Sequence, residues 1–151
     1  MTTTLRRALP ADAALLHRFI SALAEYERSP ESVEVSVSTL EAQLAEAKPP
    51  FECLIADSAE TAVGFVLFFE HYSTWRGKRG LWIEDLFVLP EHRGAGHGAK
   101  LFDAVVAIAD ERGAGRVEWA VLDWNQPAID FYKQRGAEGL SEWTTFRLTR
   151  R

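Results

Sequence analysis

The chain has 151 residues, of which 47% are hydrophobic and 26% are charged, and its formal net charge is -5. These values are typical of a soluble globular protein, so we expect a single domain over residues 1–151. The acidic balance argues against nucleic acid as a partner, because a protein neutralises phosphates with clustered Lys and Arg side chains. The same balance suits a cationic substrate.

Cysteine content and hydropathy exclude further classes of protein. Cys53 is the only cysteine, so an intrachain disulfide framework is not possible. The first residues lack the apolar run of a signal peptide, and no stretch of about 18 apolar residues would span a bilayer. We therefore expect a cytoplasmic protein without a membrane segment. No metal is expected, because no metal-ligand spacing connects the four histidines, His17, His71, His92 and His97.

The N-terminal part of the chain predicts a strand, two helices and a second strand. Leu5–Leu9 is a short strand, and Asp12 opens a helix with apolar residues at helical spacing. Ser38 is expected to cap a second helix that ends before two prolines. Phe51–Ala56 is the next strand, and its Cys53 is expected to be a buried core residue rather than a nucleophile.

The remaining elements complete an α+β pattern. Val63–Tyr72 and Leu81–Leu89 are nearly continuous apolar runs, which is typical of strands covered on both faces. The later elements are a helix, a strand, a short helix and a final strand, over Gly98–Arg112, Arg116–Leu122, Pro127–Gln134 and Trp143–Leu148. The order βααβββαβαβ predicts a mixed sheet flanked by helices, with one β-α-β crossover around the first of these later helices.

A glycine-rich loop joins a predicted buried strand to a predicted helix and reads Arg93-Gly94-Ala95-Gly96-His97-Gly98. Glycines allow several backbone N–H groups to turn toward one point, and the helix start adds positive potential. Arg93 contributes a permanent charge at the lip of this loop. The sequence therefore predicts an anion site suited to phosphate; the alternative is a connection that binds nothing.

Two common phosphate-binding patterns do not fit this loop. The nucleotide-hydrolase loop needs Gly-Lys-Ser/Thr, whereas Ala99 follows Gly98, and the dinucleotide fingerprint needs a glycine where Leu101 stands. The loop instead resembles the R-x-x-G-x-G/A signature of the GNAT superfamily of N-acetyltransferases, whose loop amides hold the pyrophosphate of coenzyme A. A second run, Asn125 to Gly136, resembles that family's Asn-x-x-A/S-x-x-x-Y-x-x-x-G segment.

The resemblance implies a fold, a cosubstrate and a set of roles. It implies a mostly antiparallel sheet of about six or seven strands, with acetyl-CoA as cosubstrate and no metal. Tyr132 would be the general acid beside the coenzyme sulfur, and Glu84 would act as base through water. The residues expected to contact the coenzyme are Leu86, Phe87, Val88, Arg93, Gly94, Ala95, Gly96, His97, Gly98, Ala99, Asn125 and Tyr132.

The adjacent carboxylates Glu84 and Asp85 are a candidate for proton transfer. Neighbouring residues of a strand face opposite sides, so in this apolar strand one carboxylate should be paired or have a raised pKa. The alternative is that both are ordinary carboxylates at a strand end.

Within the superfamily, the sequence is most similar to the spermidine/spermine (diamine) N-acetyltransferases and their thialysine-acetylating relatives. The shared runs are Leu23–Glu27, Trp82–Val88 and Asp123–Pro127 through Ala137. The resemblance implies a homodimer and a small-amine pocket lined by Tyr26, Glu27, Trp75, Glu84 and Asp85. Carboxylates and aromatic faces suit an alkylammonium group.

The acceptor is open at this point. The loop Arg76–Gly80 is basic and one residue longer than in the polyamine-specific members, so we expect it to disfavour a long polycation. A short diamine, or an amino acid with a side-chain amine such as thialysine or lysine, is the expected acceptor, by direct transfer in a ternary complex. The alternatives are a protein lysine or N-terminal acetyltransferase and a non-catalytic acetyl-CoA-binding sensor.

Overall fold

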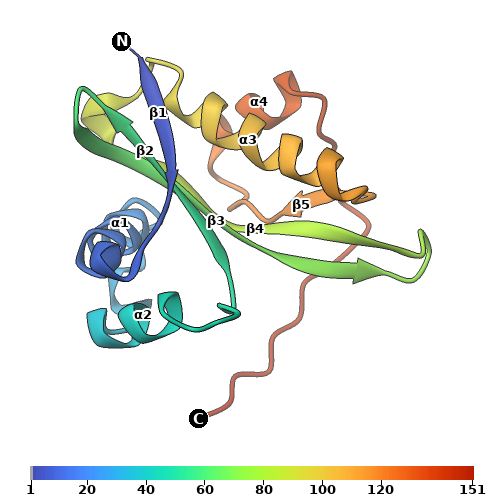
Figure 1. Ribbon diagram of the computed structural model, residues 1–151. Helices are drawn as coiled ribbons and strands as arrows, with labels where there is room; N and C mark the ends of the chain where they lie inside the picture. Colours follow the sequence, from blue (N-terminus) through green and yellow to red (C-terminus); the bar gives the residue numbers. More distant parts are fainter. Residues whose placement is uncertain (1) are drawn as a thin grey trace. The chain divides into compact units, whose positions relative to one another are not determined.

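The computed structural model describes residues 2–151, which divide into two compact units that meet after Ala120. The first unit holds a five-stranded sheet in the order β1-β2-β3-β4-β5 (Figure 1). Its strands are β1 Thr3–Arg7, β2 Glu52–Ser58, β3 Thr61–Ser73, β4 Lys78–Val88 and β5 Val117–Trp119. Its α-helices are α1 Ala13–Tyr26, α2 Val37–Leu44 and α3 His97–Arg112. Three short 3-10 helices cover Pro10–Asp12, Pro30–Ser32 and Pro90–His92.

The sheet is mixed and mostly antiparallel. Strands β1 to β4 pair antiparallel in sequence order, and β5 pairs parallel to β4. Helix α3 connects the two parallel strands, so the predicted β-α-β crossover is confirmed. The α+β class and the element order are also confirmed up to the last helix. The strand count is five, fewer than the six or seven expected.

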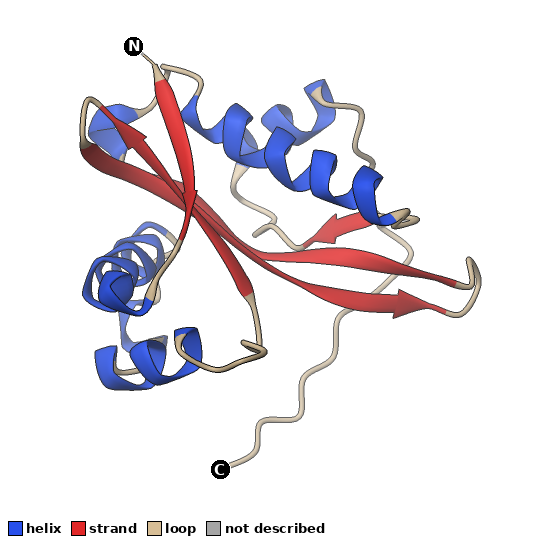
Figure 2. Ribbon diagram, in the orientation of Figure 1, coloured by secondary structure: helices blue, strands red, loops and turns tan. Residues whose placement is uncertain are grey.

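Helices cover both faces of the sheet (Figure 2). One face packs under α1, whose buried residues Leu16, Phe19 and Leu23 form a cluster with side chains of β2, β3 and β4. The Phe19 and Phe65 rings stack there with centroids 5.6 Å apart. The opposite face is covered by α3, which buries Leu101, Phe102, Val105 and Ala109. This double cover explains the nearly continuous apolar character of β3 and β4.

Several predicted boundaries move when the elements form. The first strand begins and ends two residues earlier than Leu5–Leu9, and β5 is shorter than Arg116–Leu122. Ser36 rather than Ser38 caps α2, because its side chain accepts the N–H of Thr39 at 3.1 Å. A serine two residues further on lies inside the first turn, so it cannot reach that orphan donor.

The second unit, Val121–Arg151, contains α4, Gln126–Gln134. Asn125 caps this helix as expected, since its Oδ1 accepts the N–H of Ala128 at 3.3 Å. The predicted final strand over Trp143–Leu148 is wrong, because these residues form neither helix nor strand. Trp143, Phe146 and Leu148 remain 64%, 91% and 84% exposed, so the apolar burial that would stabilise a strand there is missing.

Three other expectations concern buried and absent groups. Cys53 is confirmed as a buried core residue, and burial raises the pKa of its thiol to about 12. Among residues 2–151, no helix has the length and apolarity needed to cross a membrane. Nor does that part of the chain gather three or more side chains able to hold a metal ion.

Candidate active site

The glycine-rich loop leads directly into α3, as its sequence predicts. Gly94 and Gly96 adopt φ of 87° and 85°, and an added Cβ at either position would meet nothing within 4 Å. These glycines are therefore required by backbone conformation rather than by crowding. The first α3 backbone hydrogen bond of this turn runs from the N–H of Lys100 to the carbonyl of Gly96, so the N–H groups that precede Lys100 in the first turn have no acceptor within the helix. This arrangement suits an anion.

Arg93 does not simply extend from the loop into solvent. Its Nε donates to the backbone carbonyl of Val88 at 2.9 Å, and its guanidinium lies 4.6 Å from the centroid of the Tyr26 ring. It also lies 5.3 Å from the centroid of the Phe87 ring. Arg93 thus connects the end of β4, the anion loop and the C-terminal end of α1.

One edge of β4 has no strand partner next to this loop. Strand β5 pairs only with Leu81, Trp82 and Ile83, so the sheet opens between β4 and β5 from Glu84 onward. The backbone of Leu86, Phe87 and Val88 lies along this open edge. An extended chain of amide groups can therefore pair with it as an additional strand would.

A β-bulge shapes β4 beside the opening. Leu67 pairs with Asp85 and Phe68 pairs with Ile83, so Glu84 is an extra residue without a partner on β3. Trp82 pairs with Phe69, which lies on the same face of β3 as Leu67, and its Nε1 donates to Glu84 Oε1 at 3.3 Å. Glu84 and Asp85 therefore lie on the same face of the sheet. The expectation that they face opposite sides is wrong, because the bulge breaks the alternation of the strand.

The α1 face thus carries an acidic cluster, which we define as Glu27, Glu84 and Asp85. Burial, together with the charges of Glu84 and Glu27, raises the pKa of Asp85 to about 7. Burial and the charge of Glu84 also raise the pKa of Glu27. The prediction of one raised pKa is confirmed, and no Lys or Arg of residues 2–151 forms an ion pair with the cluster.

Comparison with known proteins agrees with this geometry. The family model described as "Acetyltransferase (GNAT) family" matches residues 16–137. The chain belongs to the GNAT acetyltransferase family. A thialysine N-epsilon-acetyltransferase from Bos taurus is 37% identical over 155 residues, covering 95% of this chain and 91% of that protein. This chain is therefore an N-acetyltransferase.

Two further matches indicate the range of similar proteins. An L-ornithine N5-acetyltransferase from Arabidopsis thaliana is 45% identical over 103 residues, which cover 67% of this chain and 45% of that protein. A solved aminoglycoside acetyltransferase from an uncultured soil metagenomic sample has a TM-score of 0.80 and 20% identity. It covers 99% of this chain, and this chain covers 97% of it. At that identity the structural likeness shows the fold alone.

The GNAT enzyme brings some of the predicted acceptor residues together and not others. Tyr26 is the last residue of α1, and Glu27 is its C-cap. The Arg93 guanidinium lies over the Tyr26 ring, and the charge of Glu27 acts on Asp85 of β4. Trp75 lies in the turn between β3 and β4 and is 80% exposed. Asp85 lies ten positions further along the chain, on the far half of β4. Within one chain, Trp75 is therefore not part of the acidic cluster.

The remaining predicted residues are distributed over both units. His97 is buried at the start of α3, and its Nδ1 forms a 2.8 Å hydrogen bond with Thr3 Oγ1. Its side chain therefore ties α3 to β1, while its backbone N–H belongs to the anion loop. Tyr132 lies half-buried on α4, and its ring forms a T-shaped pair with the Phe131 ring, with the two centroids 5.4 Å apart. Tyr132 and Asn125 belong to the second unit.

Sequence reasoning missed two features of this site. The contact of Arg93 with the Tyr26 ring joins residues 67 positions apart, and nothing in the loop motif signals it. The bulge at Glu84 was also missed, although the two adjacent carboxylates in an apolar strand were a signal that alternation fails there. Bulges often occur beside active sites, where they change the direction of a side chain.

Proposed function

We propose that this enzyme transfers the acetyl group of acetyl-CoA directly to a primary amine of a small cationic molecule, in a ternary complex. The acceptor is a short diamine or an amino acid with a side-chain amine. One observation carries the proposal: burial and the neighbouring carboxylates of the acidic cluster raise the pKa of Asp85 and of Glu27, and no Lys or Arg of residues 2–151 forms an ion pair with the cluster. A bound alkylammonium would supply that missing charge.

The donor side of the proposal uses the loop and the open edge of β4. The amides from Gly94 to Ala99 would hold the coenzyme pyrophosphate at the start of α3. The backbone of Leu86 to Val88 would pair with the pantetheine arm, and one N–H of this edge would stabilise the oxyanion. Asn125 and Tyr132 complete the coenzyme contacts in this proposal.

The chemical step needs two proton transfers from nitrogen and one to sulfur. An alkylammonium has a pKa of about 10.4, so Glu84 first takes one proton through water. The amine then attacks the thioester carbonyl carbon, the C–N bond forms, and the C–S bond breaks. Tyr132 protonates the departing thiolate, and the second nitrogen proton restores the Tyr132 hydroxyl. The products are one amide, one coenzyme thiol and one net proton.

The proposal also includes a homodimer in the cytoplasm. Trp75 would then reach an acceptor site through a second copy, because it lies at the hairpin turn and is largely exposed. The basic residues of that turn would accompany it and disfavour long polycations.

Thiol release from acetyl-CoA tests the function with a panel of amines: putrescine, spermidine, spermine, lysine, thialysine and a lysine-containing peptide. Turnover of diamines or amino acids supports the proposal, whereas turnover of the peptide alone favours a protein acceptor. Calorimetric binding of acetyl-CoA without turnover of any amine would favour the sensor. An absence of coenzyme binding would contradict the assignment of the anion loop.

A further inference from the structure

Arg93 is the first residue of the glycine-rich loop, and the loop motif alone would direct its charge at the coenzyme phosphates. The contacts of its side chain lie elsewhere. Its Nε donates to the carbonyl of Val88 at 2.9 Å, which is the last residue of β4. Its guanidinium carbon lies 4.6 Å from the centroid of the Tyr26 ring and 5.3 Å from that of the Phe87 ring.

The two rings beside Arg93 belong to the α1 face of the sheet. Phe87 is buried in the cluster that α1 forms with the sheet, and Tyr26 packs against that cluster as the last residue of α1. Helix α3, which the loop enters, covers the opposite face (Figure 2). The Arg93 side chain therefore points toward the α1 face, whereas the loop backbone continues into the helix on the other face.

Two kinds of contact fix the orientation of the guanidinium. The face of an aromatic ring attracts a cation, and a planar guanidinium can stack on it. The hydrogen bond from Nε to the Val88 carbonyl sets the direction from which the group approaches Tyr26. Among residues 2–151, no Asp or Glu forms an ion pair with Arg93, so no carboxylate pulls the group out of this position.

The chain leaves α1 through a strained residue. The helix ends at Tyr26, and the N–H of its C-cap Glu27 donates to the carbonyl of Leu23 at 2.9 Å. Arg28 then has a φ of 64°, a left-handed conformation that is unfavourable for residues other than glycine. Helix ends fray readily, so the contact between Arg93 and the ring of Tyr26 opposes fraying where strain favours it.

Glu27 connects this contact to the acidic cluster. It directly follows Tyr26, and its charge helps to raise the pKa of Asp85 to about 7, after burial and the charge of Glu84. A shift of the end of α1 would move Glu27 relative to β4 and would expose Asp85, on the same face, to more water. Both changes would lower the pKa of Asp85.

We propose that Arg93 is a positioning residue for the acceptor: it holds the end of α1, and with it Glu27 of the acidic cluster, in place beside β4. This inference rests on the proposed function, in which the cluster binds the ammonium group of the acceptor. It assigns the Arg93 side chain to the acceptor side of the reaction, although the backbone of this residue belongs to the coenzyme loop.

Arg93→Lys separates this role from the binding of coenzyme phosphates, because lysine keeps the charge but lacks the planar group and the Nε donor. Lysine binds phosphate well as a point charge, so the Kd for acetyl-CoA, measured by calorimetry, should change by less than about twofold. The KM for the amine that the wild-type enzyme acetylates best should rise about tenfold at saturating acetyl-CoA. The value of kcat should change much less, whereas a general loss of folded enzyme would lower kcat and leave KM unchanged.

Titration of the Asp85 carboxyl by carbon NMR tests the same role without coenzyme or turnover. Loss of a nearby cation alone would raise the pKa of a carboxyl group, whereas displacement of Glu27 would lower it. In Arg93→Met, which loses both the charge and the contacts, the pKa of Asp85 should therefore fall below its wild-type value of about 7. An increase would overturn the proposal.

Two further variants act as controls. Arg116→Met removes the same charge from another exposed arginine of the first unit and should leave the Kd, the KM and the Asp85 titration unchanged. Tyr26→Leu should raise the KM as Arg93→Lys does, and the double variant should be no worse than either single variant. Additive effects would show that Arg93 does not act through Tyr26, and would overturn the proposal.

The coenzyme measurements give the opposing result. A weaker affinity for acetyl-CoA in Arg93→Met that Arg93→Lys restores, with an unchanged KM for the amine, would assign Arg93 to the coenzyme and overturn the proposal. If the wild-type enzyme acetylates no amine of the panel, the proposed function fails. The Asp85 titration would still decide whether Arg93 positions Glu27, so the two failures are distinguishable.

Discussion

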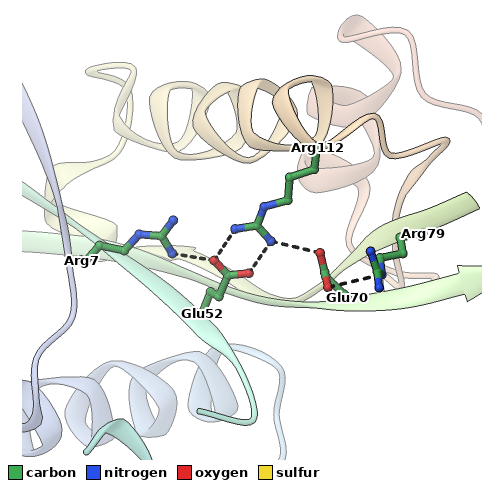
Figure 3. A network of polar contacts seen from close by, with 5 residues as sticks. All are labelled: Arg7, Glu52, Glu70, Arg79 and Arg112. Atoms are coloured by element: carbon green, nitrogen blue, oxygen red, sulfur yellow. Dashed lines mark hydrogen bonds and ion pairs between the residues drawn. The ribbon is translucent and has the colours of Figure 1, made fainter. Parts of the chain in front are cut away.

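Two groups of charged side chains on one sheet differ in how their carboxylates are compensated. In the described part of the chain, no Lys or Arg forms an ion pair with the acidic cluster of Glu27, Glu84 and Asp85, and the pKa values of Glu27 and Asp85 are raised. The network around Glu52 in Figure 3 joins two carboxylates to three arginines, and the pKa of Glu52 is lowered. The network stabilises the fold, whereas the cluster is costly until a cation binds.

The largest expected effect separates catalysis from stability at the cluster. Glu84→Gln removes the proposed base, so kcat/KM for an amine should fall about 100-fold. The melting temperature should hardly change, because Glu84 is exposed and lies at the bulge. Glu60→Gln, an exposed change at the β2–β3 turn, is the control and should leave both quantities unchanged. Full activity of Glu84→Gln would remove Glu84 from the mechanism.

Asp85→Asn should alter the pH dependence of stability. In the folded protein the pKa of Asp85 is about 7 instead of 3.8, so between these pH values the folded state binds more protons than the unfolded state. The wild-type protein therefore loses stability at this group as pH rises from about 4 to 7, by at most about 4 kcal/mol. The variant lacks this loss.

Urea denaturation of both proteins from pH 4.5 to pH 8 measures this effect. The free energy of unfolding of Asp85→Asn, relative to wild type, should increase steadily over that interval. A difference independent of pH would mean that Asp85 titrates normally and that the cluster is not strained by its own charge.

Glu52→Gln should show the opposite pH dependence. In the wild-type protein, the pKa of Glu52 is lower in the folded state than in the unfolded state. This difference contributes stability that is present above pH 4.5 and is lost as pH falls through the folded-state pKa. Loss of the ion pairs of Glu52 with Arg7 and Arg112 should cost about 1–2 kcal/mol at pH 7, measured by urea denaturation. Glu111→Gln, an exposed change on α3, should cost much less. Equal costs would show that the network adds no stability.

The smallest effect belongs to the outermost member of the network. Arg79 Nε lies 3.9 Å from Glu70 Oε1, and the Arg79 side chain is 76% exposed. Arg79→Gln should therefore change the free energy of unfolding by less than about 0.5 kcal/mol. A loss as large as that of Glu52→Gln would mean that the network acts as one unit.

Local patterns in the sequence predicted most elements of the fold. Helical spacing, proline breaks and the glycine loop identified α1 to α4 and β1 to β5 within a few residues. The final strand failed because β-propensity over Trp143–Leu148 does not guarantee a buried face. The serine that caps α2 was misplaced by two residues, since several serines there satisfy the same local rule.

The site was predictable where it depends on local sequence and not where it depends on pairing register. The anion loop follows from its glycines, and the two carboxylates from their place in an apolar strand. Their common face follows from a bulge opposite Leu67 and Phe68, which is a property of the β3–β4 pairing. The network around Glu52 joins Arg7 to Arg112, and no local pattern brings these residues together.

The central claim is that the acidic cluster is completed by the ammonium group of the acceptor. The most direct test is the titration of the Asp85 carboxyl by carbon NMR, with and without a saturating small amine acceptor. We expect a pKa near 7 in the free protein and a decrease of at least one unit when the amine is bound. An unchanged pKa in the presence of bound amine would contradict the account, because the cation would then bind elsewhere.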